Sequence, residues 1–157
     1  MKKRVYCSEC GKKISAKEKK SNKKGFIISA GILIIIAAGL CMALSGSAFL
    51  NAVNTPNPYY YNWDHYNYNS YDWIQYEMNL VIALVSIFAF STGVVSGLLI
   101  LKRSSFKYSL IGIIFVNIAS ILSIGNNVIV FLLIGLPVFV LSLITMIFTI
   151  HSKEFFK

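Results

Sequence analysis

The long apolar runs of this chain contain no Asp, Glu, Lys, Arg or His. Only 13% of its 157 residues are charged, against roughly 25% in an average soluble domain, and 56% are hydrophobic. This scarcity of charge excludes a disordered protein and an ordinary soluble enzyme, and a total of three cysteines excludes a secreted disulfide scaffold. The composition is that of a membrane protein with several spans.

Four apolar runs are free of Asp, Glu, Lys, Arg and His, and they cover 26–50, 79–101, 108–124 and 128–150. A helix crosses a hydrocarbon core of about 30 Å with roughly 20 residues, so the third run is at the lower limit. Proton relays and ion-coupled carriers need an ionisable group in the membrane, and small four-span multidrug exporters depend on a glutamate in the first span. We therefore expect an all-α integral membrane protein with four transmembrane helices, and neither of those transport classes.

Lysine and arginine are absent from 51–78 and from 125–127. All 15 basic residues lie in 1–24, in 102–107 or in the last residues of the chain. The positive-inside rule then predicts that both termini are cytoplasmic, that the protein lies in the plasma membrane and that loop 51–78 faces outward. The chain divides into a basic cytoplasmic head, 1–24, and a four-helix transmembrane domain, 25–157.

Small residues recur at intervals of four in the first two runs, a spacing that lets helices approach closely in lipid. They are Gly39, Ala43 and Ser47 in the first run, and Ala89, Gly93 and Gly97 in the second. We expect these two ridges to be contact faces, either with each other or across an oligomer.

Polar and helix-breaking residues mark the second half of the chain. Asn117 lies near the middle of the third run, where it is expected to hydrogen-bond a neighbouring helix; a role in a solute pathway is the alternative. Gly125 suits a left-handed position that ends the third helix, and Asn126 or Asn127 suits the N-cap of the fourth. Pro137 should kink the fourth helix.

The head contains a Cys-x-x-Cys pair. Cys7 and Cys10 have the spacing of a zinc knuckle, in which two thiolates bind one metal from a tight turn, and Gly11 lets the backbone turn beneath them. The segment 5–15 resembles the first half of the short bacterial zinc ribbon, which recurs at the N-terminus of membrane proteins. The resemblance implies that these three residues are knuckle positions.

This head departs from the ribbon because residues 16–24 contain no second pair of ligands, whereas a structural zinc needs four. Four interpretations stay open: a Zn²⁺ shared between two chains in a homodimer, a site completed by another protein, a thiol redox pair, and a remnant. A catalytic redox role is disfavoured because cytoplasmic thiols stay reduced. Cys41 lies within the first run and is expected to be a buried, small apolar residue.

Residues 12–24 contain seven lysines and one acid, Glu18. They suit a solvated linker that enforces the topology, and they also suit contact with anionic lipid headgroups. Nucleic acid is not expected as a partner.

The predicted outer loop is rich in aromatic residues. They suit an interfacial aromatic belt, or alternatively a surface that recognises sugars or a partner protein. The candidate recognition residues are Tyr59, Tyr60, Tyr61, Trp63, Tyr66 and Trp73.

The layout and the knuckle together resemble small bacterial four-span membrane proteins of unknown function that carry an N-terminal zinc ribbon. The sequence has no nucleophile–base pair, carboxylate pair or phosphate-binding loop, so an enzyme is not expected. We expect a non-enzymatic interaction or assembly protein, or an envelope-associated one. The alternative is a small oligomeric pore or carrier.

Overall fold

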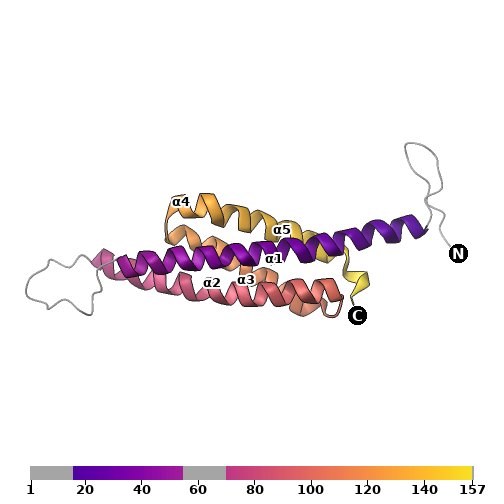
Figure 1. The fold of residues 1–157 in the computed structure, drawn as a ribbon, viewed down its shortest axis with the longest axis horizontal. Coiled ribbons are helices and arrows are strands. Elements are labelled where there is room, and N and C mark those ends of the chain that lie inside the picture. Colours follow the sequence, from indigo (N-terminus) through magenta and orange to yellow (C-terminus); the bar gives the residue numbers. More distant parts are fainter. Residues whose placement is uncertain (1–15, 55–69, 157) are drawn as a thin grey trace, which may run out of the picture.

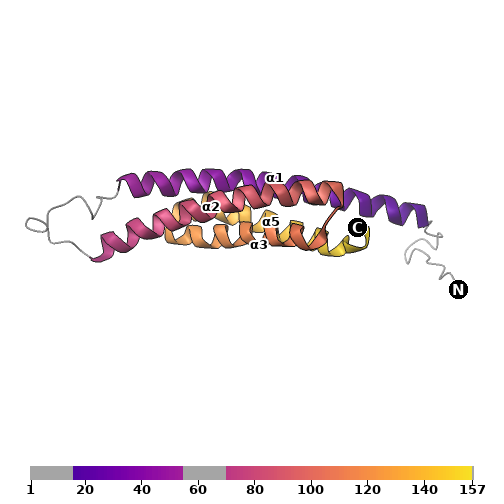
Figure 2. The same cartoon turned by 90° about the horizontal axis from the view of Figure 1, so that it is seen from below.

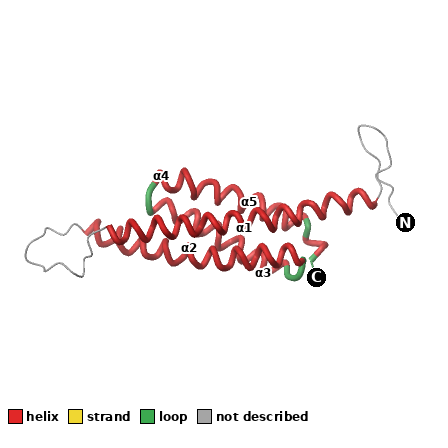
Figure 3. The backbone as a smooth tube through the Cα atoms, viewed as in Figure 1, coloured by secondary structure: helices red, strands yellow, loops and turns green. Residues whose placement is uncertain are grey.

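The computed structural model describes residues 16–54 and 70–156, which are helical apart from short turns (Figures 1 and 3). The long helices are α1 (Ala16–Asn54), α2 (Ser70–Lys102), α3 (Phe106–Leu122) and α5 (Leu136–His151). A 3₁₀ turn, Ser123–Gly125, extends α3. The short helix α4 (Val128–Val130) and a π-helical segment, Phe131–Gly135, lead directly into α5, and a second 3₁₀ turn, Lys153–Phe155, follows it.

Four segments are long and apolar enough to cross a membrane: Gly25–Asn54, Ile74–Lys102, Phe106–Gly125 and Val128–His151. The expected all-α class with four spans is therefore confirmed, and the chain is a multi-pass membrane protein. The third span reaches 20 residues because its helix begins at Phe106 and its 3₁₀ turn continues to Gly125.

The first two helices are longer than the apolar runs predicted. Helix α1 begins at Ala16, so residues 16–24 are a helical continuation of the first span and not the expected linker. Helix α2 begins at Ser70, so only residues 55–69 separate it from α1, where the sequence predicted a loop over 51–78. Hydropathy marks the part of a helix that lies in lipid, whereas the internal backbone hydrogen bonds of that helix persist beyond it.

The spans form an antiparallel bundle in which α1 and α3 each pack against both α2 and α5 (Figures 1 and 2). One end of the bundle, the terminal end, carries the turn between α2 and α3 and the residues after α5. Helix α1 projects beyond this end. The opposite end, the loop end, carries Asn54, Ser70 and the turn 125–127.

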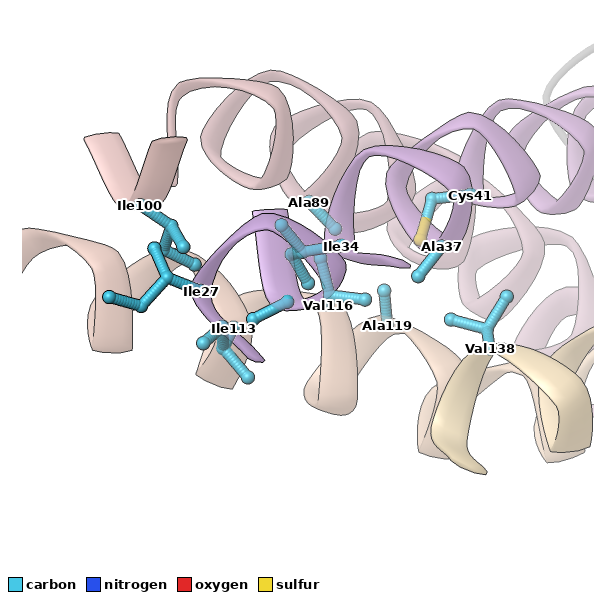
Figure 4. Close-up of a cluster of buried hydrophobic side chains, with 11 residues drawn as sticks. Ile27, Ile34, Ala37, Cys41, Ala89, Ile100, Ile113, Val116, Ala119 and Val138 are labelled. Carbon is cyan, nitrogen blue, oxygen red and sulfur yellow. The ribbon is translucent and has the colours of Figure 1, made fainter. Parts of the chain in front are cut away.

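The core of the bundle is built from small and branched side chains contributed by all four spans (Figure 4). Its largest fully buried apolar members are isoleucine, leucine and valine, and alanines fill much of the rest. Large side chains point outward instead: Phe88 is 66% exposed and Leu133 is 71% exposed. This distribution is what lipid favours, because helix contacts there depend on close packing and not on burying the largest apolar groups.

Two glycine contacts set the spacing of the first three helices. A Cβ on Gly97 of α2 would lie 3.0 Å from the carbonyl oxygen of Gly31 in α1. A Cβ on Gly112 of α3 would lie 2.5 Å from the carbonyl oxygen of Thr92 in α2. The second position in particular admits no larger residue unless the backbones separate.

The turn between α2 and α3 is a Schellman motif with an arginine at the left-handed position. Arg103 has φ 55°. Its N–H donates to the carbonyl of Ile100 at 3.0 Å, and the N–H of Ser104 donates to the carbonyl of Leu99 at 3.1 Å. Glycine is the usual residue here because a Cβ is strained in this region.

The turn between the third and fourth spans differs in part from the prediction. The side chain of Asn127 accepts a hydrogen bond from the N–H of Ile129 at 2.8 Å, so Asn127 is the N-cap. Gly125 is not left-handed; it ends the 3₁₀ turn, where it lies close to Met78. The last helical turns of α3 tighten instead of reversing through a left-handed residue.

Pro137 lies in the first turn of α5, directly after the π-helical segment Phe131–Gly135. The N–H of Leu136 donates to the carbonyl of Phe131, five residues earlier. Proline cannot donate to the carbonyl four residues before it, and the wider π turn re-pairs the backbone at that point. What the structure shows next to Pro137 is therefore a change from α-helix to π-helix over Phe131–Gly135.

We predict opposite effects for two glycine substitutions. Gly112→Ala should lower the free energy of unfolding by about 1–3 kcal/mol, because its Cβ overpacks against the α2 backbone. Gly39→Ala, where a Cβ meets nothing within 4 Å, should raise it by up to about 1 kcal/mol through helix propensity. Unfolding in detergent, followed by circular dichroism, measures both. Equal stability of the two variants would contradict the close contact of α2 and α3.

We also predict that Arg103→Gly is more stable than Arg103→Ala by about 1 kcal/mol, since only the glycine relieves the left-handed strain. Both variants lose the guanidinium, so their difference isolates the backbone effect. The same unfolding measurement applies, and an alanine variant as stable as the glycine variant would show that the turn is not strained.

Candidate functional site

The described spans offer little metal or acid–base chemistry. Within residues 16–54 and 70–156, no group of three or more His, Cys, Asp or Glu side chains could hold a metal ion. Cys41 is fully buried in the apolar core between α1 and its neighbours, as expected for a small apolar residue (Figure 4). Cys7 and Cys10 lie outside the described residues, so the half zinc site stays a prediction.

Asn117 joins α3 to α5. The hydroxyl of Ser142 donates to Asn117 Oδ1 at 2.7 Å, and Asn117 Nδ2 donates to the carbonyl of Ile113 at 3.0 Å. Both polar atoms of the amide therefore have partners, one of them on a neighbouring helix. Such an inter-helix bond in lipid contributes about 0.6 kcal/mol on average.

A second polar cluster lies at the loop end. Asn126, in the turn, accepts a hydrogen bond from Asn51 of α1 and donates through Nδ2 to Ser47 Oγ at 3.2 Å. These bonds tie the end of α1 to the turn between the third and fourth spans. Ser47 itself also donates to the carbonyl of Leu44 at 2.9 Å.

Asn79 of α2 lies at the same level of the bundle. A Cβ on Gly125, beside Asn126, would lie 3.2 Å from Met78 Cε and 3.7 Å from Ile82 Cδ1, one residue before and three after Asn79. Asn79 is fully buried, yet neither its Nδ2 nor its Oδ1 has a hydrogen-bond partner. In lipid such a group is costly unless something bonds to it.

One face of α5 carries three buried hydroxyls, at Ser142, Thr145 and Thr149, and Ser152, directly after the helix, adds a fourth. Thr145 donates to the carbonyl of Leu141 at 2.8 Å, whereas the hydroxyls of Thr149 and Ser152 have no partner. Ser86 of α2 is also fully buried without a partner. Together with Asn79 of α2 and with the buried Ser120 and the partly buried Asn117 of α3, these residues form what we call the buried polar file: Asn79, Ser86, Ser120, Asn117, Ser142, Thr145, Thr149 and Ser152.

The two predicted small-residue ridges do not meet. Ala89, Gly93 and Gly97 are buried, and a Cβ on Gly93 would lie 2.8 Å from Ala38 Cβ of α1. On the first span, Gly39 and Ala43 are exposed on the outer surface of the bundle. Their other predicted role, contact across an oligomer, stays a prediction.

Aromatic side chains pair at the terminal end of the bundle. The rings of Phe26 and Phe148 are tilted by 53° with centroids 5.0 Å apart, and those of Phe106 and Phe156 meet edge to face at 5.6 Å. The ammonium of Lys153 lies 5.4 Å from the centroid of the Phe106 ring. Phe155 and Phe156 also pack against the apolar core, so the residues after α5 fold back onto the bundle.

Sequence reasoning missed Gly31, Gly112 and the unpartnered Asn79. The close helix contacts at Gly31 and Gly112 could not be predicted from the sequence, because a single small residue in a span is common. Asn79 begins the second apolar run, so hydropathy alone indicates only a boundary there. An amide three and four residues before Ile82 and Ala83 lies on the same helical face as these two buried residues, and this pattern indicates a buried amide.

The predicted recognition residues Tyr59, Tyr60, Tyr61, Trp63 and Tyr66 lie outside the described residues, and Trp73 is described only as part of the α2 backbone. Comparison with protein-family models, with curated proteins and with solved structures finds no match to this chain. The resemblance of residues 5–15 to a zinc ribbon therefore stays a prediction.

Proposed function

We propose that this chain is a non-enzymatic interaction or assembly protein of the plasma membrane, with both termini in the cytoplasm. The bundle holds the basic head on one side of the membrane and the aromatic segment on the other. One observation carries the proposal: the basic residues gather at the terminal end, where α1 projects beyond the other helices.

The distribution of charge supports this orientation. Lys102, Arg103 and Lys107 flank the turn between α2 and α3, and Lys153 follows α5. Helix α1 adds the five lysines of residues 16–24 at the same end. A one-sided set of basic residues suits the cytoplasmic face and attracts anionic lipid headgroups at about 1 kcal/mol per residue near the surface.

The continuity of α1 supports a mechanical link between head and bundle. One unbroken helix of 39 residues runs from Ala16 to Asn54. A change in how the head is held is therefore transmitted directly to the first span, which packs against both α2 and α5. A shared Zn²⁺ between two heads would hold two such helices together in a homodimer.

The surroundings of the hydroxyl groups support a non-enzymatic role. The serine and threonine hydroxyls whose bonds the structure describes donate to backbone carbonyls or to Asn117, and none of them pairs with His, Asp or Glu. A nucleophile needs such a base beside it.

We predict about one Zn²⁺ per two chains in the purified, reduced protein, since each chain supplies two thiolates and a structural site takes four. Elemental analysis and native mass spectrometry in detergent measure the zinc and the dimer together. The variant Cys7→Ser/Cys10→Ser should lose both, while Cys41→Ala, whose thiol is buried in the core, should keep both. Metal-replete protein that contains no zinc and is monomeric would contradict the assembly proposal.

A second candidate, a small pore or carrier, is favoured by the position of Asn117 and Ser142 and by the π-helical segment seven residues before Ser142. It predicts that Asn117→Leu abolishes solute flux into proteoliposomes while the bundle stays folded, because only one inter-helix hydrogen bond is lost. The exposed neighbour provides the control, Ile118→Leu, which should leave flux unchanged. Equal solute flux in Asn117→Leu and Ile118→Leu would contradict the pore or carrier function.

A further inference from the structure

Within residues 16–54 and 70–156, four buried polar side chains have no hydrogen-bond partner. Asn79, Ser86 and Ser152 are fully buried, and Thr149 is 1% exposed. The unpaired atoms are both polar atoms of Asn79 and the hydroxyl oxygens of the other three. Serine and threonine in a helix ordinarily bond to a carbonyl of the preceding turn, as Thr145 does, so these side chains forgo a partner that is close at hand.

Their positions along the bundle are not random. Asn79 lies in the part of α2 toward the loop end and Ser86 lies at the midpoint of α2, whereas Thr149 lies in the last turn of α5 and Ser152 directly follows it at the terminal end. The polar groups between them are all paired: Ser120 to a backbone carbonyl, Ser142 to Asn117, and Thr145 to a backbone carbonyl. The buried polar file is thus satisfied in its middle and unsatisfied at both ends.

The contacts between helices place these groups in sequence along the membrane normal. Because Gly93 meets Val116 and Thr92 meets Gly112, antiparallel register brings Ser86 to the level of Ser120. From there the file passes through Asn117 and Ser142 to Ser152. At about 1.5 Å of rise per residue, Asn79 to Ser86, Ser120 to Asn117 and Ser142 to Ser152 together span about 30 Å, which is the thickness of the hydrocarbon core.

The chemistry of the file selects its ligand. An unpaired hydroxyl or amide is satisfied by a molecule that both donates and accepts hydrogen bonds. Because these side chains are buried, only a small molecule can reach them. None of the file residues is charged, and no Asp, Glu, Lys, Arg or His lies between 79 and 101 or between 128 and 150, so nothing offsets the desolvation of an ion. Water and small uncharged solutes fit both conditions.

We propose that water enters this bundle from both ends, reaching Asn79 and Ser86 from the loop end and Thr149 and Ser152 from the terminal end. The hydrogen bond from Ser142 to Asn117 closes the path between the two hydrated segments. Each single chain thus contains an interrupted permeation path for water and small uncharged solutes. This path does not depend on the proposed assembly role, since it uses neither the head nor a second chain.

The test is the accessibility of single cysteines in the full chain, reconstituted in liposomes, to methyl methanethiosulfonate, a small uncharged thiol reagent. The thiolate attacks the sulfenyl sulfur of the reagent, forms a mixed disulfide and displaces methanesulfinate, and the thiolate forms only where water reaches the cysteine sulfur. The background carries Cys7→Ser, Cys10→Ser and Cys41→Ala. The test substitutions are Asn79→Cys and Thr149→Cys, and the matched controls are the lipid-facing neighbours Val81→Cys and Ile147→Cys, which are 48% and 64% exposed on the bundle surface.

Asn79→Cys should react at least about tenfold faster than Val81→Cys, and Thr149→Cys at least about tenfold faster than Ile147→Cys. Reaction of either test variant at the rate of its control would overturn the proposal.

A second measurement uses a variant of nearly unchanged shape. If water bonds to the Thr149 hydroxyl, Thr149→Val loses that bond and its melting temperature in detergent should fall. If the hydroxyl is dry and unpaired, removing it relieves an unsatisfied polar group and the melting temperature should rise. A rise would overturn the proposal even if a cysteine variant failed to fold. Because the head is intact in Thr149→Val, zinc content and dimer mass report separately on the proposed assembly function.

Discussion

Close contact between helix backbones is the constraint on which the rest of this bundle depends. Lipid is as apolar as leucine, so no hydrophobic force separates the inside of a membrane protein from its outside, and helices associate through packing. Here the backbones meet at Gly31 and Gly97, and again at Gly112 and Thr92. These contacts explain why alanine fills much of the interior, and why phenylalanine and leucine side chains such as Phe88 and Leu133 face the lipid. They also leave room in the core for small hydroxyls, which can lie between closely packed helices without separating them.

The same constraint decides how polar groups are treated. Every buried donor and acceptor in lipid needs a partner within the protein or a water molecule. In the middle of the bundle the protein supplies it: Ser142 bonds to Asn117, and Thr145 bonds to its own helix. At the fourth span the chain also repairs the backbone, because a π-helical segment re-pairs the carbonyls next to Pro137. The unpaired polar groups therefore do not reflect generally loose packing of the bundle. They occur at Asn79, Ser86, Thr149 and Ser152, whereas the other buried side-chain polar atoms of the described residues have partners.

The sequence predicted the spans well and the contacts less well, for physical reasons. An apolar run reports transfer into lipid, so it located four membrane helices, but it could not show that polar residues 16–24 and 70–78 continue α1 and α2. Spacing by four residues identifies a stripe on a helix without saying which neighbour covers it; Gly93 and Gly97 are buried, whereas Gly39 is exposed. The inter-helix hydrogen bond of Asn117 was predictable, because an amide near the middle of an apolar run must find a partner. The hydroxyls of Thr149 and Ser152 were not, since serine and threonine are tolerated on any helix face by bonding to their own backbone.

Charge and polarity are separated in this chain, and the separation limits what each part can recognise. The basic residues lie at the terminal end and along the projecting start of α1, outside the hydrocarbon region, where they can attract only acidic partners such as anionic headgroups. The buried polar file is uncharged, so it can accept water or an uncharged solute and disfavours any ion. The paired rings of Phe26 with Phe148 and of Phe106 with Phe156 lie at the terminal end as well. A partner bound at the charged end therefore acts next to the end of the buried polar file, and it can affect that file only by moving the helices that enclose it.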